Sequence, residues 1–187
     1  MSLFDIILLA IALAMDCFTV SIVSGVILGR YDWRVILQMS LLFGLFQALM
    51  PLLGWFGMTL FAEYIVSFGH LIAFLMLAFI GGKMVYESFG PSEENSFNPR
   101  KLVTQLLLAV ATSIDAMAVG VSFSAIGYNT LSSLWVPLGW IGVFSLIFGI
   151  AGHHLGIRFG FITKGRVKPE LLGGIILICI GLKILLF

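Results

Sequence analysis

The chain has 187 residues, of which 60% are hydrophobic and 10% are charged, with a net charge of +1 and a mean hydropathy of +1.14. Soluble domains carry about 25% charged residues, so this composition predicts an integral membrane protein without a basic face for nucleic acid. Cys17 and Cys179 lie in apolar segments without metal-ligand spacing, which argues against a disulfide framework or a zinc site. The N-terminus lacks the features of a cleaved signal peptide, so the first apolar segment is predicted to be retained.

Six segments are long and apolar enough to cross a bilayer, which takes about 20 residues of helix. They are predicted at Leu3–Leu28, Val35–Gly57, Ile65–Ser88, Leu102–Ile126, Leu131–Ile157 and Leu171–Phe187. Most connectors are short, but residues 90–101 contain prolines, asparagines, serines and charges, which predicts a flexible linker. The linker divides one all-α membrane domain into two halves of three helices, residues 1–89 and 102–187.

The two halves share an ordered set of motifs. The matched positions are Ala12 and Asp16 with Ala111 and Asp115; Gly44, Gln47, Pro51 and Gly54 with Gly142, Ser145, Gly149 and Gly152; and Ile80–Lys83 with Ile180–Lys183. Because each half has an odd number of spans, the second half must enter the membrane from the opposite side. This pattern predicts two inverted repeats, as in many secondary transporters whose site lies near the midplane between the repeats.

Lysine and arginine indicate the orientation. The connectors after the first, third and fifth helices carry Arg30, Arg34, Arg100, Lys101, Arg158, Lys164, Arg166 and Lys168. The connectors on the other face, residues 58–64 and 127–130, carry none. Since positive charge collects in cytoplasmic loops, both termini are predicted to lie outside the cytoplasm.

Asp16 and Asp115 each lie near the centre of an apolar helix. A charged residue there costs about 2.5–3.5 kcal/mol on insertion scales, so it is a functional-site hypothesis by default. Small residues repeat every fourth position beside each acid: Cys17, Ser21 and Gly25 in one half, Ala116, Gly120 and Ser124 in the other. Such spacing allows close helix approach, so the first and fourth helices are expected to cross and present both acids to one cavity.

Oxygen ligands around two aspartates suit a hard divalent cation such as magnesium, calcium or manganese. The candidate ligands are Asp16, Asp115, Gln47, Thr19, Ser113 and Ser122. Pro51 adds to the case for Gln47, because a proline inside a helix frees the carbonyl group four residues earlier. Lys83 and Lys183 could either reach the interface or pair with an aspartate in an empty site, and both readings stay open. His153 and His154 are adjacent and do not share a helix face, so they are not expected to form a metal pair.

Several of these motifs together resemble a known family. They are the two Ala-x-x-x-Asp motifs, the run Thr-Ser-Ile-Asp-Ala-Met-Ala-Val-Gly-Val at 112–121, the run Phe-Gly-x-x-Gln-x-x-x-Pro-x-x-Gly-Trp at 43–55, Gly173-Gly174 and Ile180–Lys183. Over essentially the whole chain they look like the bacterial manganese efflux pumps of the MntP type, within the lysine-exporter superfamily. The resemblance implies six helices in two inverted triplets, export from the cytoplasm and functional aspartates at Asp16 and Asp115. Some members carry glutamate where this chain has Gln47, and a sporulation-associated branch shares the domain.

These observations predict a secondary exporter of divalent manganese in the bacterial cell membrane, with alternating access around the two aspartates. Manganese would be the substrate rather than a cofactor, and protons are the expected counter-ion because two carboxyl groups in one desolvated site favour proton exchange. No nucleotide-binding loop is present to couple ATP. The alternatives are an exporter of another divalent metal or of a cationic amino acid, and an intramembrane aspartyl or metal-dependent hydrolase. The oligomeric state is not predicted.

Overall fold

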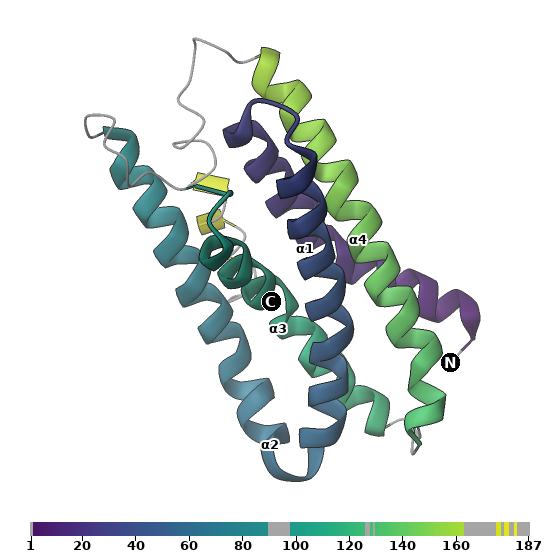
Figure 1. Cartoon of the computed structure of the whole chain (residues 1–187). Helices are drawn as coiled ribbons and strands as arrows, with labels where there is room; N and C mark the ends of the chain where they lie inside the picture. Colours follow the sequence, from purple (N-terminus) through teal and green to yellow (C-terminus); the bar gives the residue numbers. More distant parts are fainter. Residues whose placement is uncertain are drawn as a thin grey trace.

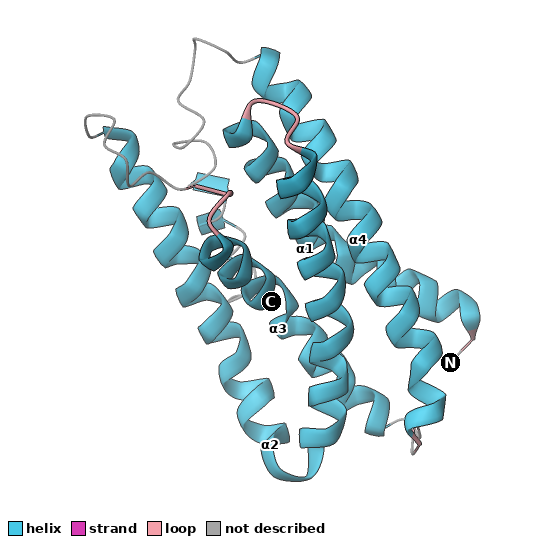
Figure 2. Ribbon diagram, viewed as in Figure 1, coloured by secondary structure: helices cyan, strands magenta, loops and turns pink. Residues whose placement is uncertain are grey.

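The computed structural model describes residues 2–89, 98–125, 128, 130–162 and, toward the C-terminus, 175, 176, 178, 179 and 182. Every regular element in this part of the chain is helical. The elements are α1 (Leu3–Leu28), α2 (Trp33–Phe89), α3 (Leu102–Ala125) and α4 (Leu131–Ile162). Figure 1 shows them as a bundle, and Figure 2 shows the short loops that join them at its ends. The all-α prediction is confirmed.

Four segments of these helices are long and apolar enough to cross a membrane. They are Leu3–Leu28, Trp33–Gly57, Leu102–Ser124 and Leu131–Phe159. These four correspond to the predicted first, second, fourth and fifth spans. The predicted sixth span, 171–187, and the predicted linker, 90–101, lie mostly outside the described residues, so the count of six spans stays a prediction.

The predicted connector at 58–64 has helical backbone. Helix α2 is assigned without a break across it, and Figure 1 shows the α2 ribbon turning back on itself at the bottom of the view. The chain therefore reverses direction after the second predicted span. The segment Met58–Tyr64 contains neither glycine nor proline and includes methionine, leucine, alanine and glutamate, which favour helix.

Helix α1 has well-defined ends. The side chain of Ser2 accepts a hydrogen bond from the backbone N–H of Asp5, and the Asp5 carboxylate accepts one from the N–H of Ser2, which together form a capping box. At the other end Gly29 takes a left-handed conformation with φ of 60° and its N–H bonds to the carbonyl of Gly25. Only three residues separate Gly29 from α2, so α2 starts at the same end of the bundle at which α1 finishes.

The helices are paired closely through small residues. Helix α1 packs mainly on α4 and α2 mainly on α3, with a further contact between α2 and α4. A Cβ atom placed at Gly25 of α1 would lie 2.5 Å from the carbonyl oxygen of His153 in α4. A Cβ atom at Gly120 of α3 would collide with the backbone of Pro51 in α2. Glycine is therefore required at both contacts.

This pairing corrects one expectation from the sequence. The small-residue stripes were expected to join the first and fourth predicted helices, which are α1 and α3. In the structure Ser21 and Gly25 of the α1 stripe lie against α4, and Gly120 of the α3 stripe lies against α2. Cys17, the first residue of the α1 stripe, lies beside Thr112 of α3. Small-residue spacing shows that a helix face is closely packed, but it does not identify the partner. Helices α1 and α3 meet in a smaller contact at the level of the aspartates.

The buried apolar residues form two clusters, one toward each end of the bundle. The first contains Cys17, Val20, Val23, Met39, Phe43, Leu108, Ala109 and Ala111. The second contains Ala10, Leu13, Met50, Ala116, Phe123, Leu134, Leu138 and Ile141. In α1 the boundary between the clusters falls between Leu13 and Cys17, and in α3 it falls between Ala111 and Ala116. Asp16 and Asp115 lie at these boundaries.

Candidate functional site

Asp16 of α1 and Asp115 of α3 come together where the two helices meet. Both side chains are half-buried, and their carboxyl groups are close enough for a direct side-chain hydrogen bond. Asp115 Oδ1 also accepts a hydrogen bond from the backbone N–H of Ala116 over 2.8 Å. A hydrogen bond between two carboxyl groups requires one proton. Two carboxyl groups this close can together balance the charge of one divalent cation.

Gln47 of α2 lies beside this pair and is fully buried. Its Nε2 donates to the carbonyl oxygen of Thr112 over 2.9 Å and lies 3.4 Å from the carbonyl oxygen of Leu13. Its Oε1 is buried without a hydrogen-bond partner among the described residues. The amide nitrogen thus fixes the orientation of the side chain, and the oxygen remains available as a ligand.

Leu13 and Thr112 occupy matching places. Each lies three residues before an aspartate, Leu13 before Asp16 and Thr112 before Asp115. One Gln47 side chain therefore contacts the same backbone group of both aspartate helices. These two carbonyl groups were not predicted from the sequence, although their equal spacing from the aspartates is a signal that could identify them.

Cys17 completes the contact between the three helices. Its Sγ lies 3.9 Å from Thr112 Oγ1 and 3.4 Å from Gln47 Nε2, and its side chain is fully buried. The Thr112 hydroxyl donates to the carbonyl of Leu108 over 2.9 Å. Both described cysteines are free thiols. Cys17 acts here as a small buried side chain that allows α1, α2 and α3 to meet.

The other three predicted ligands bond to their own helices. The hydroxyl groups of Thr19, Ser113 and Ser122 donate to the carbonyls of Met15, Ala109 and Ala118 at 2.9, 2.7 and 3.1 Å. Ser113 lies two residues before Asp115, about 200° away around the helix, and Ser122 is exposed. The contacts of the described residues therefore gather Asp16, Asp115 and Gln47, and they leave these three hydroxyls engaged elsewhere.

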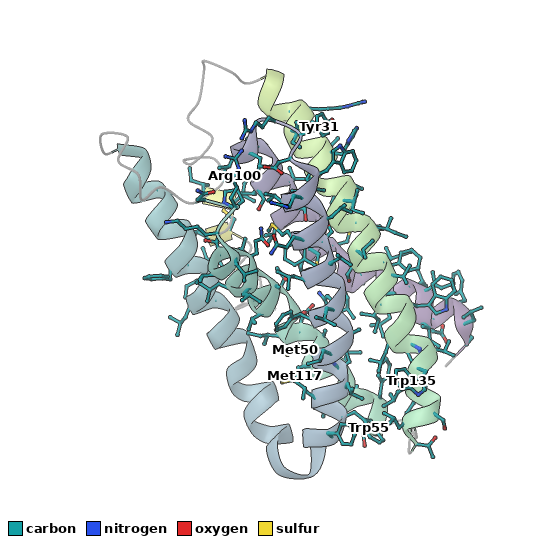
Figure 3. The ribbon with its side chains drawn as sticks, viewed as in Figure 1. Tyr31, Met50, Trp55, Arg100, Met117 and Trp135 are labelled. Carbon is teal, nitrogen blue, oxygen red and sulfur yellow. The ribbon has the colours of Figure 1, made fainter. Side chains whose placement is uncertain are left out.

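Pro51 interrupts the hydrogen bonding of α2 one turn after Gln47. Because proline lacks an N–H group, it cannot donate to the Gln47 carbonyl, which is the bond that a regular helix would contain. Figure 3 shows Met50, the neighbour of Pro51, near Met117 in the middle of the bundle. Helix α2 therefore brings both its buried amide side chain and its broken hydrogen bond to the level of the aspartates.

The donor set is made of oxygen atoms. Among the described residues no group of three histidine, cysteine, aspartate or glutamate side chains is close enough to hold a metal ion. Two carboxylates, an amide oxygen and nearby backbone carbonyls are ligands for a hard divalent cation. The side chains of Lys83 and Lys183 lie outside the described residues, so their suggested pairing with the aspartates stays a prediction.

Comparison with known proteins assigns the chain to a family. The family model described as "Mntp: Putative manganese efflux pump" matches residues 30–185. The chain belongs to this family. Three relatives carry the name "Putative manganese efflux pump MntP". One from Bacteroides fragilis is 53% identical over 97% of this chain and 94% of that protein, and one from Phocaeicola vulgatus is 47% identical over 100% and 97%. The third, from Crocosphaera subtropica, is 39% identical over 100% of this chain and 96% of its own length.

The family names agree with two predictions made from the sequence. They describe efflux pumps, so the MntP family is one of transporters rather than enzymes, and the hydrolase alternative is set aside. The four membrane-capable helices agree with a multi-pass membrane protein. No solved structure is similar to this MntP-family chain.

Proposed function

We propose that this protein exports divalent manganese from the cytoplasm through a site formed by Asp16 and Asp115. The observation that carries the proposal is the close approach of these two carboxyl groups between the two apolar clusters of the bundle. Two carboxylates balance the charge of one divalent cation, whereas an empty pair keeps a proton. Manganese is favoured over other divalent metals because the relatives of this chain are named manganese efflux pumps.

Gln47 is proposed as the third ligand. Its Oε1 is the acceptor that the described residues leave without a partner, and its Nε2 is held by Thr112. The amide supplies an oxygen ligand without adding negative charge, so the site stays neutral with manganese bound. The hydroxyl groups of Thr19, Ser113 and Ser122 would have to break hydrogen bonds to their own helices before they could bind the cation. They are therefore weaker candidates for metal ligands than Gln47.

Alternating access is proposed to arise from two inverted repeats, residues 1–89 and 102–187. The contacts between the helices support this in a specific way. A Cβ at Gly44 would lie 2.8 Å from the carbonyl oxygen of Gly142, and a Cβ at Gly142 would lie 3.1 Å from that of Gly44. These glycines are matched in the sequence repeat, so the contact between α2 and α4 is the same in both directions, as a two-fold relation requires.

A second pair of contacts supports the same relation. Gly54 of α2 lies against the carbonyl group of Met117 in α3. Gly152 of α4, which matches Gly54, lies against the carbonyl group of Phe18 in α1. Phe18 is two residues after Asp16, and Met117 is two residues after Asp115. Each aspartate helix is thus held by the corresponding helix of the other repeat.

Proton exchange is proposed to drive export. Manganese arriving from the cytoplasm would displace the proton shared by the aspartates, and protonation from outside would release the metal. The described arginine and lysine side chains lie at one end of the bundle, where α1 and α4 end and α2 and α3 begin; they are Arg30, Arg34, Arg100, Lys101 and Arg158. Figure 3 labels Arg100 at this end. We assign this end to the cytoplasm of a bacterial cell, which places the N-terminus outside.

The test is manganese tolerance in an export-deficient bacterium that expresses the native chain, Asp16→Asn or Asp115→Asn. The proposal expects the native chain to restore tolerance and lower cellular manganese, and each asparagine variant to fail at equal expression. Asparagine keeps the shape of the side chain but removes a charge that the cation needs. A native chain that changes tolerance to another divalent metal or to a cationic amino acid, and not to manganese, would refute the substrate assignment.

Proton coupling needs its own measurement. In membrane vesicles loaded with a pH indicator, manganese transport should be accompanied by proton movement in the opposite direction. Transport of manganese that does not respond to an imposed pH gradient would remove the proton from the mechanism while leaving the metal site intact.

A further inference from the structure

The buried polar groups of the bundle are concentrated in one half of it. Six side chains have a buried polar atom without a hydrogen-bond partner among the described residues, apart from Gln47 at the site itself. They are Ser21, Ser24, Ser40, Gln105, Ser145 and His153. Ser145 matches Gln47 and lies at the level of the aspartates. By their positions along the four helices, the other five lie between the aspartates and the end that carries Arg100, which we call the basic end. Arg100 is labelled in Figure 3.

These side chains differ from the other hydroxyl residues of the same helices. Thr19, Thr112 and Ser113 satisfy their hydroxyls by donating to a carbonyl one turn earlier, which is the usual solution in an apolar setting. Ser21, Ser24 and Ser40 are fully buried and do not make that bond. A buried polar atom without a protein partner is normally satisfied by water. The contrast therefore shows that the hydroxyl groups of Ser21, Ser24 and Ser40 are not committed to their own helices.

His153 gives the strongest single case. Its side chain is fully buried, and Nδ1 bonds to the carbonyl of Gly149 over 2.8 Å. That bond fixes the ring and leaves Nε2 as a second polar atom, which has no partner among the described residues. Gly149, one turn earlier on the same face, lies against Ser40 of α2. The imidazole therefore lies on the α4 face that adjoins the Ser40 hydroxyl.

The matching positions in the other half of the bundle are not polar. Adding 99 to a residue number in α1 gives its match in α3, and adding 98 to one in α2 gives its match in α4. The pairs are Ser21 with Gly120, Ser24 with Phe123, Ser40 with Leu138, Gln105 with Ile6 and His153 with Trp55. Phe123, Leu138 and Ile6 are 1%, 6% and 5% exposed. These three are about as buried as their polar matches Ser24, Ser40 and Gln105, so at these positions the two halves differ in polarity and not in burial.

We infer that Ser21, Ser24, Ser40 and His153 line a hydrated access route from the basic end to the Asp16–Asp115 pair. The route takes water and small hydrated cations, for which hydroxyl and imidazole groups replace part of the hydration shell. The matching apolar residues, including Phe123 and Leu138, close the opposite half. The inference rests on the proposed function only for the destination of the route, the aspartate pair.

Cysteine accessibility tests the route in the full-length protein. Cys17→Ala and Cys179→Ala provide a background without thiols, and Ser24→Cys and Ser40→Cys place single thiols in the route. Serine and cysteine have nearly the same shape, so these variants should fold. Phe123→Cys and Leu138→Cys are the matched controls, buried to the same degree in the other half. Each is treated in membrane vesicles of both orientations with a charged, membrane-impermeant thiol reagent.

The expected result is reaction at Ser24→Cys and Ser40→Cys from the basic end at least about tenfold faster than at the two controls, since thiol reactivity follows exposure to water. Manganese should slow the reaction at the route positions. Equal rates at all four positions, or reaction of the route cysteines only from the opposite side, would refute the route. Manganese tolerance of the same variants, measured in parallel, shows separately whether the proposed function holds.

A second measurement addresses His153 directly. His153→Gln keeps a polar side chain in the route, whereas His153→Leu fills it with an apolar one of similar size. The inference expects labelling of Ser40→Cys to persist with glutamine and to fall severalfold with leucine. Equal labelling in both variants would show that His153 does not line the route.

Discussion

The side-chain Nε2 of Gln47 donates a 2.9 Å hydrogen bond to the backbone carbonyl oxygen of Thr112. The bond joins α2 to α3 one turn before Asp115, at a place where both groups are fully or almost fully buried. It fixes the orientation of the Gln47 side chain and leaves its Oε1 without a hydrogen-bond partner among the described residues. The geometry of the aspartate pair therefore depends on a residue that carries no charge.

Replacing Gln47 with leucine should weaken both the bundle and its transport. The substitution keeps the volume but removes the side-chain hydrogen bond to the Thr112 carbonyl, and a typical hydrogen bond contributes about 0.5–1.5 kcal/mol. We expect a lower thermal unfolding temperature in detergent and reduced manganese tolerance in cells. Ser145→Ala at the matching position of α4 is the control, and its unfolding temperature should change little because its hydroxyl has no partner among the described residues. Equal losses in both variants would contradict this role for Gln47.

Much of the fold follows from the sequence because the bilayer limits the choices. Four of the predicted spans match helices of the structure. The structure brings the two aspartates together, and the cavity that they were expected to share stays a prediction. Equal spacing in two repeats predicts equal depth, which is why this contact could be expected. The cost of burying two acids separately adds to the argument.

The partners of each helix could not be predicted in the same way. Ser21 and Gly25 indicate a close contact on one face of α1, but only the structure shows that α4 provides the other side. The ligand set was also too broad for a similar reason. Whether a hydroxyl such as that of Ser113 faces a cation or bonds to its own helix depends on its rotamer, and the sequence does not specify a rotamer.

The close contact at Gly120 should not tolerate a larger residue. A Cβ atom there would collide with the backbone of Pro51, so the two helices would have to move apart. Overpacking of this kind costs about 1–3 kcal/mol. We expect Gly120→Ala to lower the unfolding temperature and to reduce transport by displacing Pro51 and, with it, Gln47.

Gly139→Ala is the control for this change. Nothing lies within 4 Å of a Cβ atom at Gly139, and alanine favours helix by about 1 kcal/mol over glycine. The unfolding temperature of this variant should stay the same or rise. Equal unfolding temperatures for Gly120→Ala and Gly139→Ala would contradict the close contact between α2 and α3 at Gly120.

Trp55 should stabilise the end of the bundle opposite to the basic end. Its indole Nε1 donates to the carbonyl oxygen of Tyr128 over 2.5 Å, which joins α2 to the loop after α3. Trp55→Phe removes this bond but keeps an aromatic ring, and a typical hydrogen bond contributes about 0.5–1.5 kcal/mol. Trp140→Phe, at a residue 37% exposed on α4, should have a smaller effect on the unfolding temperature. The opposite order would contradict a structural role for Trp55.

Manganese should stabilise the native protein through the aspartate pair. A ligand that binds only the folded state adds about 2.7 kcal/mol at a concentration 100 times its dissociation constant. The unfolding temperature of the native protein should therefore rise with manganese concentration. Asp115→Asn should lose this response, because one carboxylate does not balance the charge of the cation.

The same variant separates the metal site from the fold. Without manganese, Asp115→Asn should unfold at the native temperature or above it, since it removes an ionisable group from an apolar setting while the asparagine amide can still donate a hydrogen bond to Asp16. A drop in stability without metal would mean that Asp115 supports the bundle rather than the cation. Potassium should have no effect on either protein at the same ionic strength, because a monovalent ion cannot balance two carboxylates. A rise in the unfolding temperature of Asp115→Asn with manganese would place the metal elsewhere in the chain.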